Sequence, residues 1–369
     1  MVGSSSLPKS TSSSSAQSLY FLNAPTDALL VGGLSLLAFA LMGLVQHVQG
    51  PRAHWLWGIA ALAWLCNWPH FAATNYRLYH SRETIAQYPL TAFLVPLVMA
   101  AGAWASLASP QLVAPFFVKL FLLWSPYHYS GQAVGITLLY ARRGDIRIGP
   151  WPRRALAGFI FGTFLFNMAR VEATLSPITY YSLKVPTLGL PAWVATVTGA
   201  SMAACGAGFL VWAAAWSVRH RRLLPPILFV PALAQFVWFV VGGRVPSFFG
   251  FVPFFHGLQY LLIAWSMQLG ETLGSGGTPP APRAVLGLSL RWGAWVFAGG
   301  IALFWLLPRL VAGRGVTLDV VEPVVIAAVQ MHHFFVDGVI WKLRHARVRS
   351  PLLINLDALV RGRPSAEAA

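Results

Sequence analysis

The chain has 369 residues, of which 57% are hydrophobic and only 10% are charged, a balance that ordinary soluble domains do not reach. The formal net charge of +16 would suggest nucleic acid in a soluble protein. Here the Lys and Arg residues lie between apolar runs, where they orient the chain and meet the anionic headgroups of the lipid bilayer. Composition therefore excludes a soluble enzyme and a nucleic-acid-binding protein. It indicates an all-α, polytopic integral membrane protein, because lipid offers no hydrogen-bond partner to an open strand.

Residues 1–26 begin with a serine-rich stretch and lack the apolar centre of a signal peptide, so we expect them to be disordered. About ten apolar runs follow, each long enough to cross a hydrocarbon core of roughly 30 Å as a helix. The predicted membrane domain covers residues 27–345, and residues 346–369 form a cytoplasmic tail that could carry an interfacial helix. The predicted spans are 28–46, 55–76, 90–108, 112–140, 153–171, 189–217, 225–242, 248–268, 286–307 and 320–342.

The connections between these runs alternate in their content of Lys and Arg. The connection after the fourth run reads "ARRGDIRIGPWPRR", the one after the sixth reads "RHRR", and the segment after the last reads "KLRHARVR". The connection "ASPQLVAP" between the third and fourth runs carries no basic residue. Basic connections stay in the cytoplasm, so we expect both termini to be cytoplasmic.

Four of the predicted spans carry histidine in their apolar interior. All four are even-numbered spans, which run in the same direction, so their histidines can lie at one membrane depth around a common interior. Ionisable side chains at this depth are costly and usually mark a functional site. Interhelical hydrogen bonding is the alternative role for such residues. The histidines are His70, His128, His256 and the adjacent pair His332 and His333.

A hydrogen-bonding residue follows four of these five histidines four positions later, on the same helix face. Such a pair can act as a metal ligand and the group that orients it. The pairs are His70 with Thr74, His128 with Gln132, His256 with Tyr260, and His333 with Asp337. We therefore predict His70, His128, His256 and His333 as metal ligands, and Asp337, Gln132 and Tyr260 as catalytic or orienting residues. His332 is an alternate ligand, because adjacent helical residues point about 100° apart and only one of the pair shares the face of Asp337.

The last predicted span carries a longer polar stripe on one face. Its members are Asp319, Glu322, Gln330, His333 and Asp337. Glu322 and His333 are about 16 Å apart along a helix, too far to bind one ion. The stripe therefore favours a path or vestibule beside the site.

Three kinds of chemistry can use this set. Imidazoles with a carboxylate suit iron, which could activate dioxygen against a membrane-dissolved substrate. Histidines on facing helices can also hold haem for electron transfer. A transporter or proton pathway would need the polar stripe and no metal. Zinc-dependent hydrolysis lacks a general-base glutamate beside a histidine pair, and the sequence has no Walker loop, dinucleotide fingerprint, G-x-S-x-G elbow or H-E-x-x-H run.

At the histidine motifs the chain resembles a group of uncharacterised bacterial multi-span membrane proteins. Those proteins carry "H-x-L-Q-Y-L" and "H-H-x-F-x-D-G-x-I-W", which match His256 to Leu261 and His332 to Trp341. More distantly, the intramembrane histidines are similar to those of the retinal-forming carotene-cleaving membrane oxygenases, and this resemblance implies iron held by histidines from several spans. The "H-G-x-x-D-H" run of that family corresponds here to "HGLQY", without the acidic residue and the second histidine.

The leading hypothesis is an iron-dependent oxidoreductase of the bacterial cytoplasmic membrane. It would act on a hydrophobic, lipid-like small molecule and could draw electrons from a redox partner. A haem-binding electron-transfer protein and a transporter or ion pathway remain the alternatives.

Overall fold

A computed structural model of the chain describes residues 18–50, 62, 64–274, 280–313, 315–342, 346–354, 356 and 360. Most of the predicted N-terminal segment 1–26 and of the predicted tail 346–369 lies outside the described residues. Within them the fold is all-helical apart from one short hairpin, in which β1 (Ile178–Tyr180) pairs antiparallel with β2 (Leu183–Val185), Ile178 opposite Val185.

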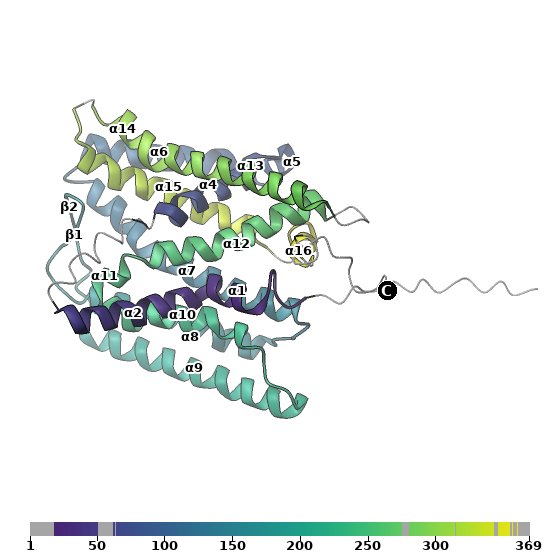
Figure 1. Ribbon diagram of the computed structural model, residues 1–369. Helices are drawn as coiled ribbons and strands as arrows, with labels where there is room; N and C mark the ends of the chain where they lie inside the picture. Colours follow the sequence, from purple (N-terminus) through teal and green to yellow (C-terminus); the bar gives the residue numbers. More distant parts are fainter. Residues whose placement is uncertain are drawn as a thin grey trace, which may run out of the picture.

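The long helices lie roughly side by side and run across the view from one end of the molecule to the other (Figure 1). The first half of the chain contains α1 (Ala24–Ala28), α2 (Leu34–Gln49), α4 (Trp64–Tyr79), α5 (Arg82–Gln87), α6 (Val95–Ala108), α7 (Ala114–Arg143) and α8 (Pro150–Val171). The second half contains α9 (Ala192–His220), α10 (Val230–Phe236), α11 (Pro246–Phe249), α12 (Val252–Leu273), α13 (Pro282–Ile301), α14 (Leu307–Val311), α15 (Leu318–Ile340) and α16 (Ala346–Leu352). Short π-helical and 3₁₀ turns join α1 to α2, precede α6, flank α10 and join α13 to α14.

Seven helical segments of the described chain are long and apolar enough to cross a membrane. They are Ala24–Gln49, Leu90–Ala108, Ala192–His220, Pro226–Arg244, Ser247–Leu273, Pro282–Val311 and Leu318–Ile340. Each overlaps one of the predicted spans, so the prediction of a multi-pass helical membrane protein is confirmed at this level. The predicted runs 55–76, 112–140 and 153–171 overlap α4, α7 and α8, which are helical but lie outside this set of seven.

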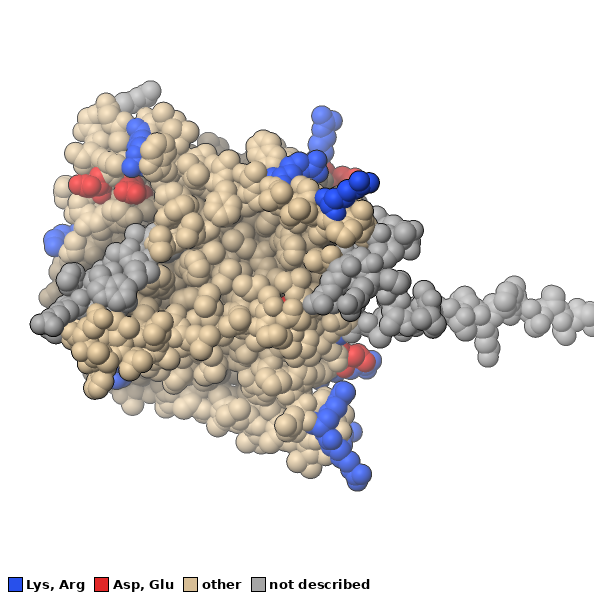
Figure 2. Space-filling model, viewed as in Figure 1, with Lys and Arg blue, Asp and Glu red and all other residues tan. Residues whose placement is uncertain are grey.

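The seven candidate spans differ in how much of their surface the protein covers. In α12 and α15, 61% of the most apolar window is buried, against 11% in α6 and α9. The outer helices present large apolar side chains such as Leu97, Trp104 and Leu210. In the face that Figure 2 shows, Lys and Arg gather toward the ends and the middle is almost entirely uncharged. An exposed apolar belt of this kind suits contact with lipid tails.

Glycines set the close approach of the central helices. A Cβ atom at Gly257 of α12 would lie 2.7 Å from the backbone oxygen of Cys66 in α4. A Cβ atom at Gly300 of α13 would lie 2.8 Å from the carbonyl carbon of Trp68, also in α4. Small residues are what allow membrane helices to pack backbone to backbone. Gly257 directly follows His256, so this approach also places that histidine against α4.

The two ends of the described chain meet at one end of the bundle, where α16 lies (Figure 1). Arg143, at the end of α7, donates hydrogen bonds to the backbone oxygens of Leu19, Tyr20, Leu352 and Ile354. The guanidinium also lies 4.2 Å from the ring centroid of Phe21. This single side chain therefore joins both terminal segments to α7.

Candidate functional site

Four imidazole rings meet in the interior of the bundle, one from each of four helices. They belong to His70 of α4, His128 of α7, His256 of α12 and His333 of α15. The ring centroids lie 4.6 Å apart for His70 and His333, 4.6 Å for His128 and His333, 5.0 Å for His70 and His256, and 5.1 Å for His128 and His256. The structure thus brings together the four histidines that the sequence pattern singles out.

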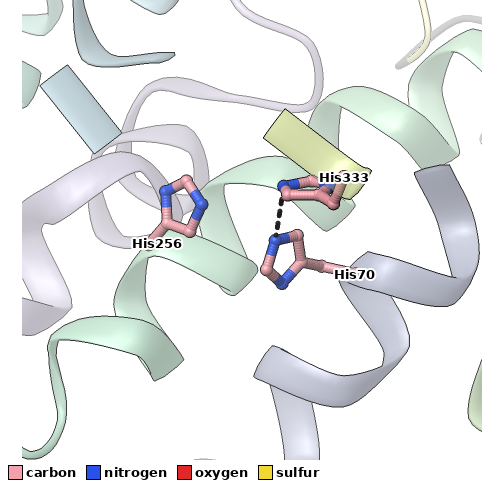
Figure 3. A group of neighbouring side chains, drawn as sticks. All are labelled: His70, His256 and His333. Carbon is pink, nitrogen blue, oxygen red and sulfur yellow. Dashed lines mark hydrogen bonds between the residues drawn. The ribbon is translucent and has the colours of Figure 1, made fainter. Parts of the chain in front are cut away.

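The Nε2 atom of His333 is the centre of this cluster. It lies 3.1 Å from Nε2 of His70 and 3.0 Å from Nε2 of His128. Figure 3 shows the rings of His70 and His333 pointing toward each other, with His256 beside them. Asp337 adds a carboxylate oxygen, Oδ2, that lies 3.5 Å from Nε2 of His333 and 3.7 Å from Nε2 of His128.

The Nδ1 atoms of His70 and His333 have hydrogen-bond partners of their own. Nδ1 of His70 lies 2.7 Å from the backbone oxygen of Asn67, which can only accept, so this nitrogen donates. Nδ1 of His333 lies 2.8 Å from Oγ1 of Thr74. The hydroxyl of Thr74 faces two groups that can only accept, the backbone oxygen of His70 and Oδ1 of Asp337. When its proton is directed to one of these oxygens, its own oxygen accepts from Nδ1 of His333.

This proton arrangement leaves lone pairs on both facing Nε2 atoms. Two imidazole lone pairs 3.1 Å apart repel each other unless a cation or a proton lies between them. A single proton can join two nitrogens, but Nε2 of His333 also faces His128 and the carboxylate of Asp337. A metal ion bound by His333 together with either His70 and His256 or His128 and Asp337 satisfies the facing groups of that set. Metal–nitrogen bonds of roughly 2.0–2.1 Å place neighbouring ligand nitrogens about 3 Å apart, the separation found here.

His256 lies in the same interior and has no hydrogen bond to either ring nitrogen within the described part of the chain. Its ring stacks on Tyr129 with centroids 4.0 Å apart, and its side chain is fully buried. A buried polar group without a partner is destabilising. Both ring nitrogens of His256 are therefore available to a ligand.

Two overlapping groups in the described chain have donor atoms within 4.8 Å of one another, and both contain His333. One is His70, His256 and His333, and the other is His128, His333 and Asp337. His332 belongs to neither group. Its Nε2 lies 3.4 Å from the hydroxyl of Tyr79, on another side of α15. The structure therefore places the alternate ligand outside the cluster.

The hydrogen bonds of the orienting residues cross between helices, which corrects the pairing of each histidine with its own i+4 residue. Thr74 contacts the ring of His333 on another helix, and only the backbone of its own partner His70. Gln132 donates to the backbone oxygen of His256 and to Gln259. Of the four predicted pairs, only His333 and Asp337 have side-chain atoms in contact. Helical spacing identifies residues on one face, but the neighbouring helix decides their partners.

Tyr260 and Asp337 complete a chain of hydrogen bonds behind the histidines. The hydroxyl of Thr74 lies 2.5 Å from that of Tyr260, which donates to Oδ1 of Asp337 over 3.2 Å. Nε1 of Trp341 is 3.2 Å from both the Tyr260 hydroxyl and Oδ1 of Asp337. Oδ1 is thus held by donors while Oδ2 faces the imidazoles. Trp341 follows Asp337 at i+4 and was not among the predicted site residues.

A cavity of about 340 Å³ lies beside the cluster and is lined by His128, Tyr260 and Asp337. Its other walls include aromatic and aliphatic side chains and glycines of α7 and α15, among them Trp124, Phe161, Ile263 and Phe334. The side chains of His70, His256 and His333 are completely buried. The cluster can therefore be reached by a small molecule from the side of His128 and Asp337.

Comparisons of the chain with protein-family models, with curated proteins and with solved structures give no match in any of the three.

Proposed function

We propose that this protein is a multi-pass protein of the bacterial cytoplasmic membrane with about ten spans, in which α4, α7 and α8 join the seven apolar candidates. Two of these additional helices, α4 and α7, carry His70 and His128, and polar side chains directed to the protein interior lower the hydropathy of a span without exposing charge to lipid. The basic connections after α7 and α9 place both termini in the cytoplasm.

The cluster of His70, His128, His256 and His333 with Asp337 binds one metal ion through one of two overlapping donor sets that share His333. The observation that supports this most directly is the 3.1 Å separation of two Nε2 atoms whose Nδ1 atoms both have another hydrogen-bond partner. Three or more imidazoles with one carboxylate suit iron as well as other first-row metals. Iron would supply redox chemistry with dioxygen, next to a cavity whose walls are mainly apolar.

The corresponding activity is oxidation of a hydrophobic substrate that reaches the cavity from the membrane. Insertion of one oxygen atom into a C–H bond converts the other atom of dioxygen to water and consumes two electrons and two protons, which a redox partner would deliver. In this scheme Asp337 and His128 border the cavity, while the Thr74–Tyr260–Asp337 hydrogen bonds orient the carboxylate.

The distances favour a single ion over haem. Two axial histidines of a haem lie on opposite sides of the iron, so their nitrogens are about 4 Å apart at bond lengths near 2 Å. Here the Nε2 atoms of the closest pairs are 3.0 and 3.1 Å apart. The remaining rings also occupy the space that a macrocycle would need.

Metal analysis of the purified protein tests this proposal. We expect close to one iron per chain, no Soret band in the visible spectrum, and loss of the metal in His333→Ala. His220→Ala is the matched control, because His220 lies exposed at the end of α9 and hydrogen-bonds only to the backbone oxygen of Trp216. A protein without metal after expression in iron-supplemented medium, or equal metal in both variants, would contradict the proposal.

A proton pathway is the second candidate, and one observation favours it. The hydrogen bonds from His333 through Thr74 and Tyr260 to Asp337 form a continuous chain of exchangeable protons. If the protein is free of metal and Tyr260→Phe abolishes proton flux into proteoliposomes, these hydrogen bonds serve proton transport. If the purified wild type contains metal and His333→Ala contains less, the result favours the oxidoreductase.

A further inference from the structure

The cavity beside the histidines extends along a face of α7 that is lined by glycine. Gly131 and Gly135 are one helical turn apart, and both border the cavity, as does Gly338 of α15. A Cβ atom at any of these three positions would meet no other atom within 4 Å. All three glycines are exposed, so no neighbouring helix requires them to be small. Their lack of side chains leaves a passage beside α7 that is open at the surface.

A second, larger cavity of about 980 Å³ adjoins the first and shares Gly135, Trp341 and Lys342 with it. Five of its lining residues are basic and one, Asp145, is acidic. The basic residues are Arg142, Arg147, Arg153, Lys342 and Arg349. We call this cavity the basic vestibule.

The cations of the basic vestibule have no acidic partner in the described part of the chain. None of the five lies within 4.0 Å of a carboxylate, whereas Arg77 pairs with Glu271 and Lys119 pairs with Glu172 elsewhere. Lys342 and Arg349 are half-buried. Several cations around one cavity attract an anionic group. A cytoplasmic loop that only sets topology would need no cavity.

We propose that the two cavities together bind an amphiphile with an anionic headgroup and a single apolar tail. The headgroup lies in the basic vestibule, and the tail passes Gly135 and Gly131 toward His128 and Asp337. Along α7, Arg142 is fourteen residues from His128, a distance of about 21 Å. One leaflet contributes about half of a hydrocarbon core of roughly 30 Å, so a tail of ordinary membrane length can span most of this path.

This inference rests on the proposed function only for the fate of the tail. If the histidines hold iron, the oxidised carbon is one far from the headgroup, because the charged end is retained at the vestibule. Binding itself does not depend on a metal. The two proposals can therefore fail separately.

Photo-cross-linking to the purified protein tests the path of the tail. The probes are three molecules with a diazirine in a sixteen-carbon chain: palmitate, lysophosphatidate with a palmitoyl chain, and hexadecanol. We expect the two anionic probes to label residues that line the first cavity, such as Phe161 and Phe334. Gly135→Leu should reduce this labelling by about tenfold or more, since the side chain fills the passage. Gly287→Leu on exposed α13 is the control, because Gly287 also has no atom within 4 Å of a Cβ.

A charge variant tests the headgroup. The triple variant Arg142→Gln, Arg147→Gln and Lys342→Gln should weaken binding of both anionic probes by at least about tenfold and leave hexadecanol unchanged. The matched control changes the three arginines at the end of α9, Arg219, Arg221 and Arg222, to Gln. They lie in a basic cluster outside both cavities. Metal content is measured in every variant, so that loss of the ion is distinguished from loss of the amphiphile.

Each outcome decides part of the inference. Binding of palmitate alone or lysophosphatidate alone supports it and identifies the headgroup as carboxylate or phosphate. Equal binding of hexadecanol, or an unchanged affinity in the triple variant, overturns the role of the basic vestibule. Labels confined to lipid-facing residues, or equal labelling of Gly135→Leu and Gly287→Leu, overturn the path of the tail. If the anionic probes label residues of the first cavity in a protein without iron, this inference is upheld and the proposed oxidoreductase is refuted.

Discussion

Nε2 of His333 lies 3.1 Å from Nε2 of His70, and this contact joins α15 to α4 across the centre of the bundle. When both rings donate through Nδ1 to their partners Asn67 and Thr74, the contact is repulsive without a positive charge and attractive with one. The same two atoms therefore link metal binding to the packing of two central helices.

Removal of the metal should lower thermal stability. An ion that binds only the folded state stabilises it by about 4 kcal/mol when its concentration is 1,000 times Kd. We expect a chelator to lower the Tm of the wild type in detergent, as followed by scanning fluorimetry, and readdition of iron to restore it. The same chelator should leave the Tm of His333→Ala unchanged. An equal decrease in both proteins would mean that the chelator acts elsewhere.

Asp337→Asn should weaken metal binding without unfolding the protein. The amide keeps the size of the side chain but removes the negative charge that faces His128 and His333. Loss of one such group typically costs 10-fold to 100-fold in metal affinity. Competition with a chelator of known affinity measures the change. Asp145→Asn, in the basic vestibule and outside both donor groups, should retain wild-type metal affinity.

Tyr260→Phe should disturb the carboxylate indirectly. The hydroxyl connects Thr74 and Trp341 to Asp337, and its loss leaves the buried hydroxyl of Thr74 and Oδ1 of Asp337 with fewer partners. We expect a destabilisation of about 1–3 kcal/mol and a lower metal affinity, measured by denaturation and metal competition. Tyr76→Phe changes a tyrosine of α4 that stacks on His80 outside the cluster, and it should alter neither quantity. A Tyr260→Phe protein with wild-type metal affinity would refute the orienting role.

Gly257→Ala should separate α12 from α4. The added Cβ atom would lie 2.7 Å from the backbone oxygen of Cys66, and overpacking of this kind costs about 1–3 kcal/mol. His256 is the preceding residue, so we also expect reduced metal content. Gly293→Ala on α13 has no atom within 4 Å of its Cβ, and it should stabilise its helix slightly, since alanine favours helix by about 1 kcal/mol over glycine. Equal stability of the two variants would show that the approach of α12 to α4 does not constrain the fold.

Helical periodicity was enough to predict the histidine positions but not their partners. His70, His128, His256 and His333 were identifiable because polar residues in apolar runs are rare and their helices were predicted to run in one direction. The hydrogen bonds of Thr74, Gln132 and Tyr260 were assigned to the wrong partners, since spacing on one helix contains no information about which helix lies opposite. The basic vestibule could not be predicted either, because Arg142 follows the fourth predicted run whereas Lys342 and Arg349 follow the last, and only the packed helix ends bring the two segments together.

The sequence by itself determined the fold class and the residues that are costly to bury, because transfer of apolar and ionisable groups between water and lipid depends on composition and order along the chain. The tertiary structure decided which of those residues meet. Glycines such as Gly257 set the separation of helices that are far apart in the sequence. That separation, rather than any local pattern, placed Nε2 of His333 between His70 and His128 and turned His332 toward Tyr79.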